Sequence, residues 1–358
     1  MRGVRRARAV LRVTPPARPD DGSLLVGRGR LSVAGVGQAG AVTDDLGDML
    51  ADAGLVEVVE GDRAAAGPTW PELGPVAVRE LQRVRVASRP AGPAVASVAD
   101  LRIADRIDGR LYCPTPSGGV ALTVFLHGGM WTIGGLDSHD RLCRRMALAT
   151  GSAVLAVDYR RAPEHPAPAA VDDTVAAILW ASGRRAELAG DGECPLLVAG
   201  DSSGGNLAAL ACLRLRDQKA APPDAQVLIY PNTDLTLSRP SVTEKAAGWG
   251  ISVDDIVWGI EFWVPEADRR ADPAVSPLFE PDLGGLPAAL IVTAEHDPLR
   301  DEGEAYAARL EAAGTPVLRR REPAMIHGFL TLDIQSPAAA AAGERIFDDM
   351  SRLIKSRP

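Results

Sequence analysis

The chain has 358 residues, a mean hydropathy of +0.00, a formal net charge of -8 and an isoelectric point near 5.3. Its few lysines and its acidic balance exclude the strongly basic surface that nucleic-acid binding needs. No run approaches the roughly 18 uncharged apolar residues of a membrane span. We therefore expect a protein that acts on small molecules and is long enough for one large α/β domain with an accessory region.

The cysteines and the N-terminus give little sign of export. The four cysteines form no CxxC pair, so we expect buried thiols rather than zinc ligands or a disulfide framework. Arg5-Arg6 is similar to a twin-arginine signal, but the apolar segment that should follow is replaced by Pro15-Pro16-Ala17-Arg18. The sequence therefore predicts a cytoplasmic protein.

Residues 1–67 are rich in glycine, alanine, arginine and aspartate, which predicts a flexible N-terminal extension. Within it, residues 43–56 have the pattern of an amphipathic helix and residues 31–36 that of a short strand. A start codon placed too early would explain the same composition. The alternative to both interpretations is a small regulatory or docking element.

Residues 68–95 are bounded by prolines and predict N-terminal helices, with Val76, Val78, Leu81 and Val84 at helical spacing. A hairpin around Asp108-Gly109 should follow, and then strands that alternate with helices, as a mostly parallel sheet requires. The later strands are expected at 121–126, 153–158, 196–199, 226–230, 289–293 and 316–321. The helices are expected at 141–149, 169–182, 205–217, 302–313 and 338–354.

One interval breaks this alternation. Residues 236–276 contain no strand pattern but hold Trp249, Trp258, Phe262 and Trp263, a large share of the aromatic residues. We expect a helical cap insertion over the strand ends, with an extra helix packed as ordinary core as the alternative. The insertion divides the α/β core into a first part, 96–235, and a second part, 277–358.

The most informative motif is Gly200-Asp201-Ser202-Ser203-Gly204-Gly205, which follows an apolar run and precedes a helical one. A serine between glycines at a strand-to-helix turn is the nucleophile-elbow arrangement. The turn brings backbone segments so close that flanking side chains would clash, which explains the glycines. The pattern predicts that Ser202 stands at the sheet edge as a nucleophile.

A serine hydroxyl is a poor nucleophile at neutral pH and needs a base to remove its proton. His327 lies beyond the last expected strand, where a loop can carry the imidazole over Ser202. His296 is a rival base, but its neighbour at the next position, Asp297, points elsewhere and cannot share a partner with it. We predict His327 as the base.

The base needs a carboxylate that fixes its tautomer and stabilises its cation. Asp297 follows the strand expected at 289–293, and the order serine, acid, histidine is that of α/β-hydrolases. Glu295 and Asp301 are rival acids, although Asp301 suits the first turn of the next helix because the backbone dipole favours a carboxylate there. We predict Asp297 as the acid.

A tetrahedral intermediate also needs hydrogen-bond donors for its oxyanion. The glycine-rich turn His127-Gly128-Gly129-Met130-Trp131 follows the strand expected at 121–126 and leaves backbone N–H groups free. The oxyanion-hole residues predicted are Gly128, Gly129 and Met130, joined by Ser203 after the nucleophile.

From about residue 70 onward the chain resembles the hormone-sensitive-lipase-like esterases of the α/β-hydrolase superfamily. The resemblance implies an eight-stranded, mostly parallel sheet flanked by helices, with a cap made from the N-terminal helices of 68–95 and the aromatic insertion of 236–276. It also implies no cofactor and activity on esters of short or medium acyl chains. It rests on HGG at 127–129, LDSHD at 136–140, DYRRAPEHP at 158–166, GDSSGG at 200–205, YP at 230–231, DPLRDEG at 297–303 and IHGF at 326–329.

Two residues depart from the family pattern. Met130 replaces the third glycine of the usual HGGG turn, and Ser203 stands where alanine is frequent. Met130 retains its N–H group, so the oxyanion hole survives if the backbone there avoids positive φ, and we expect its side chain to enter the acyl or alcohol pocket. Trp131, Trp249 and Trp258 are the candidate substrate-binding residues.

The sequence thus predicts a serine carboxylesterase that acts on a small-molecule acyl ester, with a homodimer as a possible assembly. No metal or cofactor is expected, because no glycine-rich segment completes a dinucleotide or P-loop pattern. One alternative is an amidase or deacetylase of a specialised metabolite, since the same machinery cleaves amides. The other is a non-catalytic binding protein, which only Met130 favours.

Overall fold

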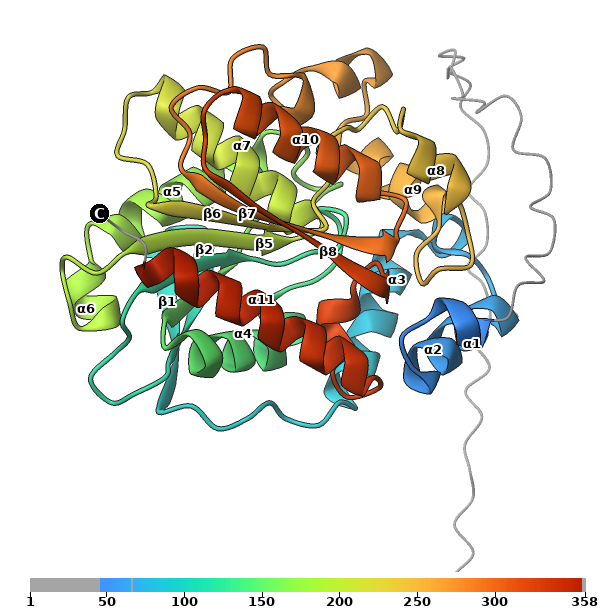
Figure 1. Ribbon diagram of the computed structural model, residues 1–358, viewed down its shortest axis with the longest axis horizontal. Coiled ribbons are helices and arrows are strands. Elements are labelled where there is room, and N and C mark those ends of the chain that lie inside the picture. Colours follow the sequence, from blue (N-terminus) through green and yellow to red (C-terminus); the bar gives the residue numbers. More distant parts are fainter. Residues whose placement is uncertain (1–45, 66, 356–358) are drawn as a thin grey trace, which may run out of the picture. The chain divides into compact units, whose positions relative to one another are not determined.

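The structure is a computed structural model that describes residues 46–65 and 67–355, built on a sheet of eight strands. The strand order is β1-β2-β4-β3-β5-β6-β7-β8 (Figure 1). β2 runs antiparallel to β1 and β4, and the other neighbouring pairs are parallel. The α/β-hydrolase fold expected from the sequence is confirmed. The strands are β1 (Ser97–Ala104), β2 (Ile107–Cys113), β3 (Leu122–Leu126), β4 (Ala153–Asp158), β5 (Leu196–Asp201), β6 (Ala225–Ile229), β7 (Ala288–His296) and β8 (Val317–Ile326).

Helices cover both faces of this sheet. α4 and α11 pack together on one face, whereas α5, α7 and α10 lie on the other (Figure 1). The helices are α1 (Leu46–Met49), α2 (Ala53–Ala64), α3 (Trp70–Ala87), α4 (Leu136–Thr150), α5 (Ala169–Ser182), α6 (Arg185–Ala189), α7 (Ser203–Asp217), α8 (Pro240–Glu244), α9 (Val253–Trp263), α10 (Arg300–Ala312) and α11 (Pro337–Lys355). None of them, within the residues described, is long and apolar enough to cross a bilayer.

The central strands bury side chains on both sides, which explains their unbroken apolar sequence. In β3, Leu122, Val124 and Leu126 join the core beneath α5 and α7, whereas Phe125 joins the core beneath α4 and α11. All five residues of this strand are buried. The two cores hold β3 and β5 in place, and the nucleophile motif follows β5 directly.

The hairpin at the start of the sheet does not turn where the sequence predicts. Ala104 pairs with Ile107, so Asp105 and Arg106 form the turn and Gly109 lies inside β2. A methyl group on Gly109 would lie 2.8 Å from a side-chain carbon of Ile103. This glycine therefore marks a close approach between strands rather than a turn.

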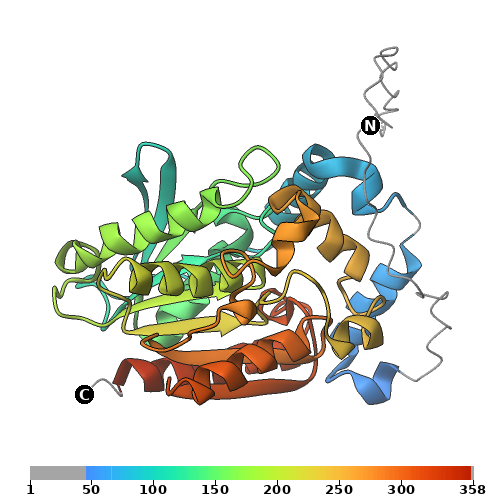
Figure 2. The ribbon, with the colours of Figure 1, turned by 90° about the horizontal axis from the view of Figure 1, so that it is seen from above.

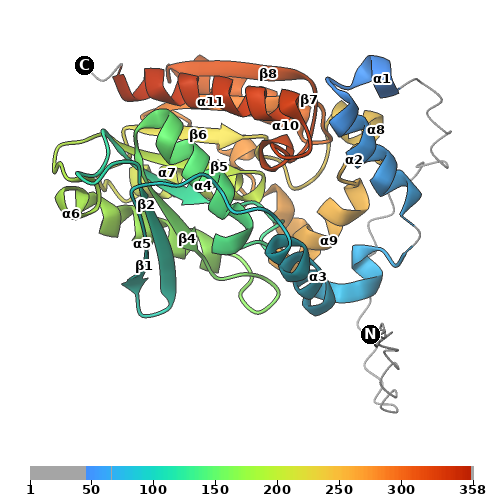
Figure 3. The same ribbon diagram turned by 90° about the horizontal axis from the view of Figure 1, so that it is seen from below.

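The cap gathers at the end of the sheet where the parallel strands finish. α3, α8 and α9 lie there together (Figures 2 and 3), and the Trp70 ring of α3 meets the Trp258 ring of α9 edge to face at 5.9 Å. Val76, Val78, Leu81 and Val84, which stand at helical spacing in the sequence, all lie on helix α3. Only Val78 is buried, whereas the other three are more than half exposed.

The N-terminal segment contributes more structure than its composition predicts. The single helix expected at 43–56 is two helices, α1 and α2, because Asp52 begins a new helix as its N-cap. Leu55 and Val59 of α2 are fully buried in the core shared with α11. Part of the core therefore comes from residues before 67, while the strand expected at 31–36 lies outside the described residues.

Asp52 also caps a second helix. One of its carboxylate oxygens accepts the Leu55 N–H of α2 at 3.0 Å, and the other accepts the Ala338 N–H of α11 at 2.8 Å and the Ser336 hydroxyl at 2.7 Å. Burial raises the pKa of Asp52, but these hydrogen bonds together lower it by a larger amount, so the net shift of the pKa is downward. The carboxylate form is therefore the one that the fold stabilises.

We expect Asp52→Ala to lower the free energy of unfolding by about 2 kcal/mol, because two helix N-termini lose their acceptor. Urea titration at neutral pH would measure the loss. Asp48→Ala, at an exposed aspartate of α1, is the control and should change it by less than about 0.5 kcal/mol. Since folding lowers the pKa of Asp52, its contribution should fade as the pH falls through that value. Equal effects of both variants would contradict this role.

Candidate active site

The nucleophile motif forms a turn between β5 and α7. Ser202 has φ 56° and ψ -123°, a strained conformation for a residue with a side chain. A methyl group on Gly204 would lie 2.0 Å from the Leu126 carbonyl oxygen, and one on Gly200 would lie 2.3 Å from the Gly204 backbone. Only glycine fits at these two positions, so the turn depends on both.

The structure brings the three predicted side chains of the site together. The Ser202 Oγ lies 3.0 Å from His327 Nε2, and the His327 Nδ1 lies 2.8 Å from Asp297 Oδ2. A carboxylate can only accept, so Nδ1 carries the hydrogen and Nε2 is left to accept from the serine hydroxyl. Asp297 is fully buried, and its other oxygen accepts the Leu299 N–H at 2.8 Å. The three groups therefore form a continuous proton-transfer chain.

The rival residues have other partners. His296 contacts the Met49 carbonyl oxygen at 2.9 Å through one ring nitrogen and the Lys245 ammonium at 3.1 Å through the other. Glu295 accepts a backbone N–H group from β8, and Asp301, in the first turn of α10, accepts one from α8. None of the three forms a hydrogen bond or ion pair with Ser202 or His327 within the described part of the chain. The geometry thus favours the residues predicted first.

The expected oxyanion hole needs one correction. The Gly128 N–H donates to Asp201 Oδ1 at 2.8 Å, so this donor is already engaged. The N–H groups of Gly129, Met130 and Ser203 have no hydrogen-bond partner among the described residues. These three remain as candidate donors to a substrate oxygen.

The backbone at Met130 also differs from the expectation. Its φ is 52°, and its neighbours Gly129 and Trp131 have φ of 127° and 55°. Three successive positive φ angles turn the loop sharply, a shape that glycine supplies freely and that costs other residues about 1 kcal/mol or more each. Met130 therefore keeps the backbone shape of a glycine, and its N–H group remains unpaired within the described structure.

A buried polar network holds this turn against the nucleophile elbow. Asp201, which precedes Ser202, lies 3.2 Å from His139 Nε2, and His139 Nδ1 lies 2.8 Å from the Ser138 hydroxyl. Burial raises the pKa of Asp201, but the nearby His139 and the Gly128 N–H lower it, and the lowering dominates. Asp201 thus links the glycine-rich turn to helix α4.

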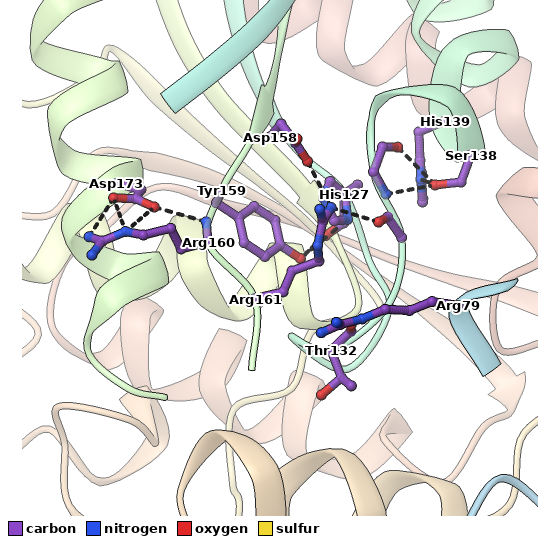
Figure 4. A network of polar contacts seen from close by, with 12 residues as sticks. Arg79, His127, Thr132, Ser138, His139, Asp158, Tyr159, Arg160, Arg161 and Asp173 are labelled. Carbon is purple, nitrogen blue, oxygen red and sulfur yellow. Dashed lines mark hydrogen bonds and ion pairs between the residues drawn. The ribbon is translucent and has the colours of Figure 1, made fainter. Parts of the chain in front are cut away.

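His127 has a structural place in the same network. The Tyr159 hydroxyl donates to the His127 carbonyl oxygen at 2.7 Å, and the two rings stack at 4.3 Å (Figure 4). Burial lowers the pKa of His127 to about 3. The imidazole is therefore neutral near pH 7 and braces the turn.

Cap helix α3 reaches into the same loop, a feature that sequence reasoning missed. The Arg79 guanidinium donates to the Thr132 carbonyl oxygen at 2.8 Å (Figure 4). It also pairs with the Glu164 carboxylate at 2.7 Å. Gln82, one turn later, accepts the Gly134 N–H at 2.8 Å. The loop is thus fixed by the cap as well as by the core. No local signal in the sequence connects α3 with a loop about fifty residues away.

The three tryptophans predicted to bind substrate are buried in ring pairs. Trp131 stacks on Trp263 with ring centroids 4.3 Å apart, and Trp249 stacks on His296 at 4.4 Å. Trp258 is 5% exposed and packs against α3. Each ring has a packing role, and a role in substrate binding stays a prediction.

Residues 123–331 match the family described as alpha/beta hydrolase fold. The match spans more than half of the chain and includes the serine, the acid, the histidine and the glycine-rich turn. The chain therefore belongs to the α/β-hydrolase family.

Within that family, its relatives are ester hydrolases. The chain is 43% identical to the carboxylic ester hydrolase LipN of Mycobacterium tuberculosis, over 75% of this chain and 73% of the relative. It is 40% identical to the carboxylesterase NlhH of the same species, over 77% and 89%. These matches confirm the resemblance to hormone-sensitive-lipase-like esterases that the motifs indicated.

Solved structures agree. Ester-hydrolase EH1AB1 from the metagenome of Lake Arreo superposes with a TM-score of 0.80 at 33% identity, over 86% of this chain and 100% of that one. A thermostable esterase from Pseudomonas putida gives 0.79 at 30% identity, over 86% and 98%. The cap and core described above therefore have counterparts in known esterases.

Proposed function

We propose that this protein is a serine carboxylesterase that cleaves small acyl esters through Ser202, His327 and Asp297. The observation that carries the proposal is the hydrogen-bonded chain from the Ser202 hydroxyl through His327 to the buried Asp297 carboxylate. Such a chain activates a serine for acyl transfer, whatever fold carries it.

In the first half of the reaction, Ser202 Oγ attacks the ester carbonyl carbon while His327 Nε2 takes the hydroxyl proton. Asp297 stabilises the imidazolium that forms. The carbonyl oxygen becomes an oxyanion, which the N–H groups of Gly129, Met130 and Ser203 are placed to bind. The tetrahedral intermediate then collapses, and the imidazolium gives its proton to the departing alcohol.

The second half repeats these steps with water. His327 removes a proton from a water molecule, which attacks the acyl carbon bound to Ser202 Oγ. The new tetrahedral intermediate releases the carboxylic acid, and the serine oxygen recovers its proton from the imidazolium. No step requires a group that the chain itself does not supply, apart from water.

The proposed substrates are esters with short or medium acyl chains. The relatives support this class by their names, among them an ethyl acetate hydrolase of Pseudomonas putida at 38% identity. A cytoplasmic location and a homodimer stay predictions, which cell fractionation and light scattering of the purified protein would test.

The proposal is tested with p-nitrophenyl esters from acetyl to palmitoyl, run beside the matched p-nitroanilide of the preferred acyl group. We expect kcat/KM to peak between acetyl and octanoyl and to be far lower for the anilide. Equal turnover of the anilide would favour an amidase. Failure of a fluorophosphonate probe to label the protein, with no ester turnover, would favour a binding protein and overturn the proposal.

A further inference from the structure

Cap helix α9 contains one glycine in its interior, Gly259, and this glycine faces the Met130 side chain. Glycine inside a helix is destabilising relative to alanine, so a buried one needs a packing reason. A methyl group on Gly259 would lie 2.4 Å from Met130 Cβ, 3.1 Å from its carbonyl oxygen and 3.2 Å from its Cγ. Gly259 therefore leaves a slot in α9 that the methionine fills.

That the Met130 side chain enters the acyl or alcohol pocket stays a prediction, and the contact with Gly259 shows which cap helix it meets. Met130 is only 4% exposed, and the first carbons of its side chain lie against α9. The residue that departs from the family pattern is thus matched by a glycine in the cap, far away in the sequence.

The next residue of the loop packs against the same helix face. The Trp131 ring stacks on the Trp263 ring with an interplanar angle of 4°. Gly259 and Trp263 are four residues apart, so they lie one above the other on α9. One face of this helix therefore contacts two consecutive loop residues that both have positive φ.

A strained backbone of this kind persists only where its surroundings fix it. Arg79 and Gln82 of α3 hydrogen-bond to the loop at Thr132 and Gly134. The contacts of Met130 and Trp131 with α9 hold the two residues before Thr132, and Met130 carries one of the candidate oxyanion donors.

We propose that Gly259 is a positioning residue: through its contact with Met130, the cap helix α9 holds the Met130 N–H where the oxyanion forms. This inference rests on the proposed esterase function. Because the donor matters most when the carbonyl oxygen has become an oxyanion, a displaced Met130 should lower kcat and leave KM nearly unchanged.

A double-mutant cycle tests the coupling. Gly259→Ala should lower kcat about tenfold or more, because the new methyl group displaces Met130, with KM within about threefold. In a Met130→Gly background there is no Cβ to displace, so the same substitution should cost less than about threefold in kcat. Equal losses in both backgrounds would overturn the proposal.

The single variant Met130→Gly tests the same contact without adding a methyl group to α9. Glycine relieves the backbone strain at this φ but leaves a cavity where the buried methionine side chain was, so thermal unfolding is measured beside kcat to show that the variant is folded. We expect kcat to fall roughly three- to tenfold, because the loop loses its contact with the slot. An unchanged kcat would show that the contact does not position the donor.

Two controls keep the result specific. Glu261→Ala changes the exposed side of α9 and should leave kcat unchanged. Titration of Ser202 with a p-nitrophenyl phosphonate gives the concentration of competent protein, so each kcat refers to folded molecules. An inactive wild type would reject the proposed function, whereas an active wild type without coupling would reject only the role of Gly259.

Discussion

Ser202→Ala is expected to lower kcat about 10⁶-fold, the loss found when a serine protease loses its nucleophile. The hydroxyl at 3.0 Å from His327 Nε2 is the group proposed to form the acyl bond, and alanine leaves nothing in its place. The fold should persist, because alanine has the same backbone requirements as serine at φ 56°. Residual turnover should come from solvent attack assisted by the oxyanion donors.

The measurement is p-nitrophenyl butyrate hydrolysis at neutral pH, with circular dichroism and thermal unfolding of each protein beside it. Ser351→Ala provides a matched control, because it removes a serine hydroxyl that donates within α11. We expect that variant to keep full activity. If Ser202→Ala retained more than about one part in a hundred of the wild-type kcat, another residue would be the nucleophile.

The parts of the site that follow from the sequence are those with a local physical cause. Gly200 and Gly204 could be recognised because both stand within two residues of Ser202, in a tight turn that only glycine fits. A Cβ atom at either position would lie 2.0 to 2.3 Å from other backbone atoms. The central strands could be placed because burial on both faces demands consecutive apolar residues. The acid and the histidine follow strands, and chain order then assigns them.

Other features depend on contacts between distant segments and leave no local signal. Gly109 has the sequence context of a turn residue. The structure shows instead that glycine is needed there because the Ile103 side chain lies too close for a Cβ atom. Gly128 seemed free to bind an oxyanion until Asp201 was found to accept its N–H. The slot at Gly259 could not be predicted, because nothing in an isolated helix says which loop lies against it.

Helix α3 shows a related limit. Its helical spacing predicted the helix correctly, but spacing cannot say which of its residues neighbouring elements will cover, and Val76 is 75% exposed. Conversely, the polar composition before residue 67 gave little sign that α2 packs on the core. Two buried residues of this helix, Leu55 and Val59, make that contact. Periodicity predicts the element, and tertiary packing decides the burial.

Asp297→Asn is expected to lower kcat about 10⁴-fold while leaving the protein folded, as for the corresponding change in a serine protease. The reason lies in the two oxygens of Asp297. One accepts the Leu299 N–H, so the asparagine carbonyl oxygen should take that place and its amide should face His327 Nδ1. An amide donates, so Nδ1 must accept and the ring hydrogen moves to Nε2, where it blocks proton transfer from Ser202.

Asp301→Asn makes the same chemical change four residues later and is the control. Asp301 accepts the Ser241 N–H at 2.9 Å and pairs with Arg300 at 2.8 Å, so its loss should affect stability more than turnover. We expect kcat within about fivefold of the wild type for that variant, since its carboxylate contacts no member of the site. Comparable losses in the two variants would mean that both substitutions act by disturbing the segment that joins β7 to α10 rather than through His327. A loss confined to Asp301→Asn would transfer the role of the acid to Asp301.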